Sequence, residues 1–381
     1  MRLLIISHTP HYGNRESASG WASTVREIDQ IATLFDSVCH LAPLYSGPAT
    51  PSFRRYAAGN VRFRPVPPAG GESMLDKFRI LAAYPSYVKA IREEMRQSDA
   101  VHVRCPANIA MCGLAVLKSS NWQGPLWIKY AGSWAGYAGE PLSYLAQRAL
   151  LRIPWINASV TVNGEWPRQP HHVVPLFNPC FTDWELSEAR AAAQGKRLEA
   201  PLRLLFAGRL DGDKGVPQFL RVVAELNSRG VEVEGELAGG GPAMADYEAM
   251  ASRLAIRSRV TFLGWLPRPV LNEAYRRAHF IVLPSRAEGW PKVLSEAMAY
   301  GAVPLAGRVG SIPQYLQSFR SGAALEPSDW REFAHTIRGY SVEPERWRVE
   351  SEAAIRAALN FSYSTYVDSV RKLFFPAAPA N

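Results

Sequence analysis

Two series of alternating strand and helix patterns constrain the fold of this sequence more than any other feature. Short apolar runs typical of buried strands recur with amphipathic stretches between them, as in "RLLIIS" followed by "GWASTVREIDQIATLF". This alternation predicts parallel sheets with helices on both faces. A polar, Ala-rich segment at 187–201 interrupts it, and "LRLLFAG" then restarts it. We therefore predict an α/β protein with two doubly wound, Rossmann-like domains that face each other across a cleft.

The segment at 187–201 also sets the expected domain boundaries. A chain of 381 residues is long enough for two domains. We predict an N-terminal domain over 1–190 and a C-terminal domain over 191–361. Ligands of open parallel sheets bind outside the carboxyl ends of the strands, so the loops after the strands should carry the chemistry.

The first such loop is "FAGRLDGDKGV", which lies between a predicted strand and a predicted helix. Gly208 lets the backbone approach a ligand closely, and Arg209 and Lys214 supply a fork-shaped guanidinium and a mobile ammonium. These groups suit a diphosphate. The Gly-Lys-Ser/Thr order of a P-loop is absent. An ordinary exposed strand–helix loop remains an alternative on spacing alone.

The second loop is "AEGWPKVLSEAMAYG", which leads into a predicted helix. Pro291 suits the first turn of a helix, and Gly301 suits its C-terminal cap. The first amides of that helix, near Lys292 and Val293, should form an anion site.

Two acids flank this helix start. Glu288 and Gly289 should lie on the loop, and Glu296 about one turn into the helix. A glycosidase pair needs two carboxyls facing one bound sugar, which an anion site between them disfavours. We expect instead that each carboxylate binds hydroxyl groups of a different part of a ligand. A solvated helix residue is the alternative for Glu296.

Three other patterns argue against particular functions or are uninformative. The loop after the first strand, "HTPHYGNRESASG", lacks G-x-G-x-x-G, which argues against a dinucleotide dehydrogenase. The eight histidines form no metal-binding motif, so we predict no metal site. "LAGGGPA" after another strand is, taken alone, compatible with a simple turn.

The net charge of +9 is shared by both halves of the chain, which argues against a nucleic-acid partner. Segment 53–79 is locally basic and aromatic, and it suggests peripheral contact with anionic lipid; a solvated loop and helix face is the alternative. Its basic residues are Arg54, Arg55, Arg62, Arg64, Lys77 and Arg79, and its aromatic residues are Phe53, Tyr56, Phe63 and Phe78. Four cysteines without metal-type spacing, and no long apolar run, favour a cytoplasmic protein; peripheral attachment to the cytoplasmic face of the membrane is the alternative.

Several spaced elements of the second half resemble one known family. "AGRLDGDKG", "LAGGGP", "VTFLGWLP", "SRAEGWPKVLSEAMAYGAVPLA" and "GSIPQYL" occur in the order found in the donor domain of retaining GT-B glycosyltransferases of family 4. The resemblance covers about residues 202–316. It implies that the domain over 191–361 binds the donor, and that the domain over 1–190 lies on the acceptor side and is completed by a C-terminal helix at 362–376. In the first half, "SGWASTVREID" is similar to the Gly-Gly turn and helix of the family, with Ser19 in place of the first glycine and Gly20 as the second.

The resemblance implies transfer of a sugar from a nucleotide-diphosphate sugar with retention of configuration, and without a metal or other cofactor. The implied catalytic residues are Arg209, Lys214 and Glu288. Glu288 would contact the sugar hydroxyls, Glu296 the ribose, and the backbone near Trp265 and Leu266 the base. The implied donor-binding residues are Gly20, Gly208, Arg209, Lys214, Gly240, Trp265, Leu266, Glu288, Gly289, Pro291, Lys292, Val293 and Glu296.

The sequence departs from the family pattern at a few positions. Ala131 follows "WIKY" where many relatives have a histidine, and Trp290 and Lys292 are also unusual. A nucleotide-sugar epimerase and a non-catalytic nucleotide-sugar-binding subunit therefore remain alternatives. The acceptor is expected to be a saccharide or a lipid-linked saccharide, in glycan, polysaccharide or glycolipid biosynthesis.

Overall fold

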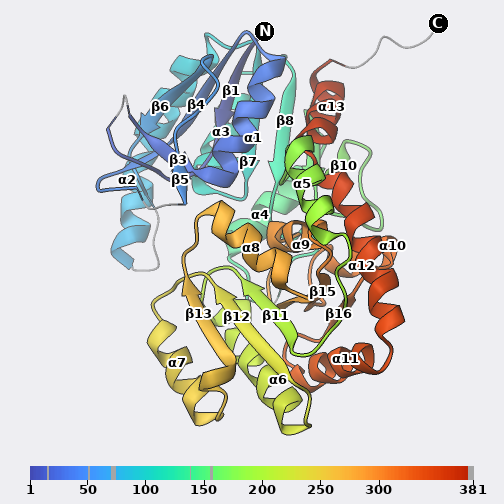
Figure 1. Ribbon diagram of the computed structural model, residues 1–381. Coiled ribbons are helices and arrows are strands. Elements are labelled where there is room, and N and C mark those ends of the chain that lie inside the picture. Colours follow the sequence, from blue (N-terminus) through green and yellow to red (C-terminus); the bar gives the residue numbers. More distant parts are fainter. Residues whose placement is uncertain (15–16, 50–51, 70–73, 138, 155–157, 376–381) are drawn as a thin grey trace, which may run out of the picture. The chain divides into compact units, whose positions relative to one another are not determined.

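The computed structural model describes residues 1–14, 17–49, 52–69, 74–137, 139–154 and 158–375, without the side chains of 74–79. The chain divides into two compact units. The first comprises Met1–Leu176 and Thr365–Asn381, and the second comprises Phe177–Ser364 (Figure 1).

The first unit is built on a parallel sheet in the order β10-β9-β8-β7-β1-β4, with β6 also paired to β4. Short strands extend it beyond β4: β2 pairs with β4, β3 with β2, and β5 with β3. The strands are β1 (Arg2–Ile6), β2 (His11–Tyr12), β3 (Ser19–Trp21), β4 (Ser37–Tyr45), β5 (Phe53–Arg54), β6 (Val61–Val66), β7 (Ala100–Cys105), β8 (Leu126–Tyr130), β9 (Ala158–Val162) and β10 (Val173–Pro175). The helices are α1 (Ala22–Ile31), α2 (Met74–Met95), α3 (Asn108–Ser119), α4 (Leu142–Leu151) and α13 (Tyr363–Phe374).

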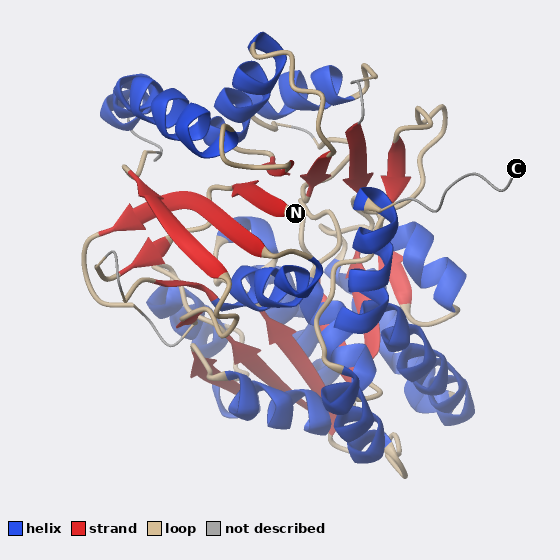
Figure 2. Ribbon diagram, turned by 90° about the horizontal axis from the view of Figure 1, so that it is seen from above, coloured by secondary structure: helices blue, strands red, loops and turns tan. Residues whose placement is uncertain are grey.

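Helices cover both faces of the first sheet, and β1 shows why. Leu3 and Ile5 belong to one buried cluster together with Ile28 of α1 and Val370 of α13. Leu4 and Ile6 belong to a different buried cluster, which includes residues of α2 and α3. Because successive side chains of a strand point to opposite faces, the apolar run of β1 supplies both cores. Figure 2 shows helices on both sides of these strands.

The second unit is also a parallel sheet between helices, in the order β13-β12-β11-β14-β15-β16. Its strands are β11 (Leu202–Ala207), β12 (Val233–Ala238), β13 (Val260–Gly264), β14 (Phe280–Leu283), β15 (Val303–Gly307) and β16 (Ala323–Leu325). Its helices are α5 (Asp183–Ala193), α6 (Val216–Ser228), α7 (Met244–Arg253), α8 (Arg268–Arg277), α9 (Lys292–Ala299), α10 (Ile312–Phe319), α11 (Trp330–Val342) and α12 (Pro344–Ala358). The prediction of two Rossmann-like α/β units is confirmed.

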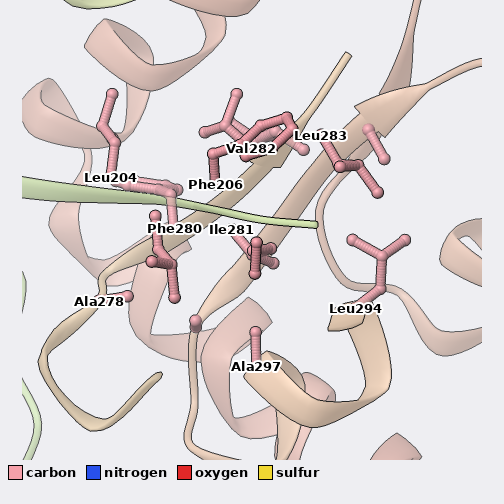
Figure 3. Packing of buried hydrophobic residues seen from close by; sticks show 14 of the residues in the cluster. Leu204, Phe206, Ala278, Phe280, Ile281, Val282, Leu283, Leu294 and Ala297 are labelled. Atoms are coloured by element: carbon pink, nitrogen blue, oxygen red, sulfur yellow. The ribbon is translucent and has the colours of Figure 1, made fainter. Parts of the chain in front are cut away.

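The core of the second unit fixes the helix that begins at Lys292. Leu294 and Ala297 of α9 are fully buried in the same cluster as Phe280 and Val282 of β14. Figure 3 shows their side chains beside the strands β11 and β14. Packing of this kind holds the start of α9 rigidly against the centre of the sheet.

The boundary between the units lies earlier than the 190/191 boundary expected from the sequence. The chain enters the second unit at Phe177 and leaves it after Ser364. The two crossing segments are joined there, because Tyr363 N donates to Phe181 O at 2.7 Å and Cys180 N donates to Phe361 O at 2.8 Å. Residues 177–190 therefore belong to the second unit.

The Ala-rich segment 187–201 is partly helical, which was not expected. Helix α5 begins with a capping box in which Thr182 and Glu185 satisfy each other's backbone amides. Beyond its end, Lys196 Nζ donates to the carbonyls of Ala278 and Tyr300, each at 2.7 Å. These carbonyls lie where α8 and α9 end, so the lysine ties the segment to the core.

The basic segment 53–79 also differs from the expected solvated loop and helix. Arg62 and Arg64 lie on strand β6 and are paired with Glu94 and Glu93 of α2. Arg54 and Arg55 are exposed. The side chains of Lys77, Phe78 and Arg79 lie outside the described residues.

Within the described ranges, no helix is both long enough and apolar enough to cross a membrane.

Candidate functional site

The strand order of the second unit reverses at β11 and β14, which are neighbours in the middle of its sheet. From β11 the chain continues to β12 on one side, whereas β14 pairs on the other side. In open parallel sheets, ligands bind in the crevice at such a switch point, outside the carboxyl ends of the strands. The loops after β11 and β14 carry Lys214 and Glu288. The topology therefore points to these loops independently of their composition.

The two loops are in direct contact. Gly215 has a φ of +81°, and a Cβ on it would lie 2.2 Å from Pro284 O. Only glycine adopts this backbone conformation readily and leaves room for the carbonyl. Arg286 N donates to Asp213 O at 2.9 Å, and Ser285 Oγ donates to the same carbonyl at 3.3 Å. These contacts fix the distance between the loop of Lys214 and the loop of Glu288.

Lys214 and Glu288 meet where the two loops touch. Lys214 Nζ lies 2.5 Å from Glu288 Oε1, and Ser285 Oγ donates to the same oxygen at 3.0 Å. The side chains of the ion pair are 23% and 14% exposed. A partly exposed ion pair contributes only about 0–1 kcal/mol to stability. Lys214 and Glu288 can therefore separate and bind a ligand instead, at a small cost in free energy.

Arg209 is placed differently from Lys214. Its side chain is 69% exposed and forms an ion pair with Asp211 at 3.1 Å, on the same loop. Among the contacts of the described residues, Arg209 is thus held by Asp211 and not by Glu288. An exposed guanidinium on this loop remains available to an anion that binds at the switch point.

Glycines bring three loops together at the carboxyl edge of the sheet. A Cβ on Gly239 would lie 1.7 Å from Gly208 O, and one on Gly240 would lie 2.4 Å from Trp265 Nε1. These contacts connect the loops that follow β11, β12 and β13. Trp265 is 48% exposed, and Leu266 packs against the core. The site thus has an exposed aromatic surface beside closely packed backbone.

Helix α9 begins where the sequence predicts. Pro291 is its N-cap, and Lys292 and Val293 are its first two residues, both half-buried. The first amides of a helix have no acceptor within the helix, and the helix dipole makes this end positive. The loop with Glu288 and Gly289 leads directly into this end, which favours an anion there.

Trp290 anchors the loop rather than a ligand. Its side chain is buried, its Nε1 donates to Ser295 Oγ at 2.7 Å, and its ring is stacked on Phe361 with centroids 5.6 Å apart. The preceding carbonyl, Gly289 O, accepts hydrogen bonds from the amide and the hydroxyl of Ser311, at 3.1 and 2.9 Å. The unusual tryptophan therefore fixes the backbone next to Glu288.

Glu296 is buried and hydrogen-bonded at both oxygens. Its Oε1 accepts from Arg268 Nη1 and its Oε2 accepts from Tyr275 OH, each at 2.8 Å. The residue is only 9% exposed. The alternative of a solvated helix residue is therefore wrong.

The remaining expected positions lie in the first unit. Gly20 is on β3, and a Cβ on it would lie 2.4 Å from His11 Nε2, so close packing explains this glycine. Ala131 follows β8, and its amide donates to Cys105 O at 2.8 Å. A contact between Gly20 and the donor stays a prediction.

Three polar residues of this region were missed in the sequence. Ser285 follows a buried strand directly, and that position could have identified it. Arg268 and Tyr275 are seven residues apart on α8, a spacing that puts both on one face of a helix. Nothing in the local pattern, however, indicates that this face meets α9.

Within the described residues, no three histidine, cysteine or acidic side chains lie together as ligands of a metal ion would. Independence from metals stays a proposal.

The geometry agrees with comparisons to known proteins. Residues 188–356 match the family model described as "Glycosyl transferases group 1". The chain is 28% identical over 208 residues to the alpha-D-kanosaminyltransferase of Streptomyces kanamyceticus, covering 54% of this chain and 53% of that protein. It is 31% identical over 232 residues to D-inositol 3-phosphate glycosyltransferase 1 of Catenulispora acidiphila, covering 56% of this chain and 53% of that protein. The chain thus spans about half the length of these curated relatives.

A solved structure extends the likeness of the fold to nearly the whole chain. A sucrose-phosphate synthase from Thermosynechococcus elongatus superposes with a TM-score of 0.72 at 18% identity, covering 98% of both chains. This likeness supports the same two-unit architecture that the sheets display. Residues 188–356 thus resemble glycosyl transferases group 1, and the two units together have the fold of GT-B glycosyltransferases.

Proposed function

We propose that this protein transfers a sugar from a nucleotide-diphosphate sugar to an acceptor, with retention of the anomeric configuration. Arg209, Lys214 and the start of α9 would bind the diphosphate, and Glu288 would bind hydroxyls of the donor sugar. The single observation that carries this proposal is the Lys214–Glu288 contact of 2.5 Å at the switch point of the second sheet. It joins a cation and the carboxylate that we propose to bind the sugar, beside a helix N-terminus.

The remaining donor contacts follow from the position of each loop. Glu296 would accept hydrogen bonds from the ribose, and the backbone near Trp265 and Leu266 would lie along the base. Gly208 and Gly240 would allow close approach of the backbone, and the half-exposed ring of Trp265 offers a flat apolar surface.

Charge development explains how such a site would accelerate transfer. When the bond between the sugar and the phosphate breaks, negative charge grows on the leaving diphosphate. Fixed positive groups aimed at it bind the transition state more strongly than the ground state. A lysine, an arginine and a helix N-terminus can supply this compensation, so we propose that neither a metal ion nor another cofactor is required. The leaving phosphate would take the acceptor proton.

The acceptor and the cellular role are broader proposals. We propose a saccharide or lipid-linked acceptor in glycan, polysaccharide or glycolipid biosynthesis. Peripheral contact with an anionic membrane, through Arg54 and Arg55 of the exposed segment, is part of the same proposal, because Arg62 and Arg64 are already paired within their unit.

Lys214→Ala tests the proposal directly. We expect transfer to fall by about 10²–10³-fold, because removal of one preorganised group in comparable sites costs about 2.7–4 kcal/mol. Transfer is followed as nucleoside diphosphate release with a panel of saccharide acceptors, and NMR of the product's anomeric proton reports retention. Lys89→Ala, which changes an exposed lysine of the first unit, is the control.

Two results would contradict this assignment. Undiminished transfer in Lys214→Ala would remove the diphosphate role of the lysine. Conversion of the donor into an isomer without any acceptor would favour the epimerase instead.

A further inference from the structure

Helix α8 presents two hydrogen-bond donors to one carboxylate of the neighbouring helix α9. Arg268 and Tyr275 are separated by two helical turns and so share a face of α8. Arg268 Nη1 donates to Glu296 Oε1 and Tyr275 OH donates to Oε2, both at 2.8 Å. Because each oxygen is held by a different residue, the plane of the carboxylate is fixed.

Burial keeps the hydroxyl of Tyr275 protonated and the carboxylate of Glu296 paired. The ring of Tyr275 is almost completely buried, and burial followed by the negative charge of Glu296 raises the pKa of its phenol. The hydroxyl therefore stays protonated and donates. The guanidinium of Arg268 compensates the charge of a carboxylate whose side chain is only 12% exposed.

Arg268 is itself held in place by the segment that enters the second unit. Its Nη2 donates to Cys180 O at 3.0 Å, and its guanidinium lies over the ring of Phe181, 5.2 Å from the centroid. Its Nε lies 3.6 Å from Glu185 Oε1. Contacts on several sides leave the arginine little freedom, so it can orient Glu296.

The second unit contains another triad of the same chemistry. Tyr340 OH donates to Glu350 Oε2 at 2.6 Å, and Arg346 Nε donates to Oε1 at 2.9 Å. Glu350 also accepts from Gly322 N at 2.7 Å, so this triad holds a turn near β16. An Arg–Glu–Tyr triad is therefore not by itself a functional feature. The triad of Glu296 differs because its carboxylate lies on α9, the helix that begins after the Glu288 loop.

We propose that Arg268 and Tyr275 are positioning residues that set the affinity for the ribose of the donor. They would hold the carboxylate of Glu296 so that its free lone pairs face the ribose hydroxyls. This inference rests on the proposed function, because it needs a nucleotide in the site. It assigns the affinity for the nucleoside, but not for the diphosphate, to side chains of α8.

The test compares ligands with and without a ribose. Isothermal titration calorimetry measures the binding of inorganic pyrophosphate and of whichever of UDP, ADP and GDP binds the wild-type protein most tightly. In Tyr275→Phe, the affinity for the nucleoside diphosphate should fall about tenfold, because a hydrogen bond to a charged group is lost, while the affinity for pyrophosphate stays within about twofold. The apparent KM for the donor should rise likewise, with kcat nearly unchanged.

Tyr340→Phe is the matched control, because it removes the same kind of buried Tyr–Glu hydrogen bond elsewhere in the unit. It should change neither affinity. Equal losses in both variants, or a parallel loss of pyrophosphate binding in Tyr275→Phe, would overturn the positioning role. If the wild-type protein binds UDP, ADP and GDP no more tightly than pyrophosphate, the proposed function would instead be overturned.

Arg268→Lys provides a second test should Tyr275→Phe be poorly folded. A lysine keeps the positive charge but cannot bond Glu296 and Cys180 O at once with the same planar fork. In Arg268→Lys we expect the affinity for the nucleoside diphosphate to fall about tenfold while the affinity for pyrophosphate is unchanged. In the control Arg346→Lys, neither affinity should change. Wild-type affinity in Arg268→Lys would contradict the proposal.

Discussion

The carboxyl edges of the two sheets use their charged residues in opposite ways. In the first unit, Glu27 is 1% exposed, and its Oε1 accepts from Arg104 Nη1 at 2.6 Å, Lys129 Nζ at 2.8 Å and Tyr366 OH at 2.6 Å. In the second unit, Lys214 and Glu288 form a pair that stays partly exposed.

Burial decides what each set of charges can do. Charges that compensate each other in the interior are committed to the fold, because separating them leaves a desolvated ion. Charges near solvent can exchange partners at small cost. Two sheets of similar topology can therefore differ at their carboxyl edges: the first edge is closed by internal ion pairs, and the second keeps its ion pair open to solvent.

The largest expected effect comes from breaking the closed set of charges. Glu27→Gln removes the negative charge that faces Arg104 and Lys129, so we expect the free energy of unfolding to fall by about 3–5 kcal/mol. Urea unfolding followed by circular dichroism measures this loss. Glu288→Gln is the matched substitution in the open set, and its stability should change by less than about 1 kcal/mol while transfer is lost. Similar stability losses in both variants would contradict the comparison.

Acid should weaken the first unit more than the second. Burial lowers the pKa of His11 to about 4, and it lowers the pKa values of His40 and His102 well below their usual range. In the second unit, burial and then Lys196 lower the pKa of His279 to about 4.

These shifts set the direction of the pH dependence. Between about pH 6.5 and pH 4, these histidines bind protons in the unfolded chain but stay neutral in the folded protein. The free energy of unfolding therefore falls as the pH falls through this window. For His11 alone the loss by pH 4 is about 3 kcal/mol. Unfolding free energies measured from pH 7 to pH 4 should show a shallower slope in His11→Gln. An unchanged slope would mean that His11 does not titrate as expected.

A smaller effect is expected where the two loops of the open edge touch. Gly215→Ala adds a Cβ close to Pro284 O at a φ of +81°, and such strain costs about 1–3 kcal/mol. Gly212, three residues earlier, has nothing within 4 Å of an added Cβ, so Gly212→Ala should change stability by less than about 0.5 kcal/mol. Thermal unfolding of both variants gives the difference. Equal melting temperatures would show that the loops tolerate separation.

The sequence predicts the open edge of the second unit better than the closed edge of the first, because the open edge is formed by patterns of residues close together in the sequence. The loop of Lys214 and the loop of Glu288 each follow an apolar strand and precede a helix, so the pattern places them at one edge of the sheet. Their actual contact depends on Gly215 and Pro284, which no local pattern connects. The site residues of this edge, including Arg209 and Glu296, stay predictions until they are tested by substitution.

The closed edge depends on partners that are distant in sequence. Tyr366 reaches Glu27 from the C-terminal helix, 339 positions away. Helical spacing predicts that helix but not its neighbours, so the buried cluster of Glu27 with Arg104, Lys129 and Tyr366 was not foreseen. The expected boundary at 190 was displaced for a similar reason. Cys180 O accepts from Arg268 Nη2 of α8, and Cys180 N donates to Phe361 O, and only the folded unit brings these residues together.

The smallest expected effect concerns exposed charges of the first unit. Arg54 and Arg55 are exposed, whereas Arg62 is paired with Glu94. If this segment contacts anionic membranes, each exposed arginine contributes about 1 kcal/mol at the lipid surface. Arg54→Ala with Arg55→Ala should therefore weaken co-sedimentation with phosphatidylserine vesicles at low salt by tenfold or more. Arg62→Ala should weaken it far less, since its charge is already compensated by Glu94. Binding that is insensitive to salt, or equal losses in the two variants, would remove the membrane contact and leave Arg54 and Arg55 as solvated surface charges.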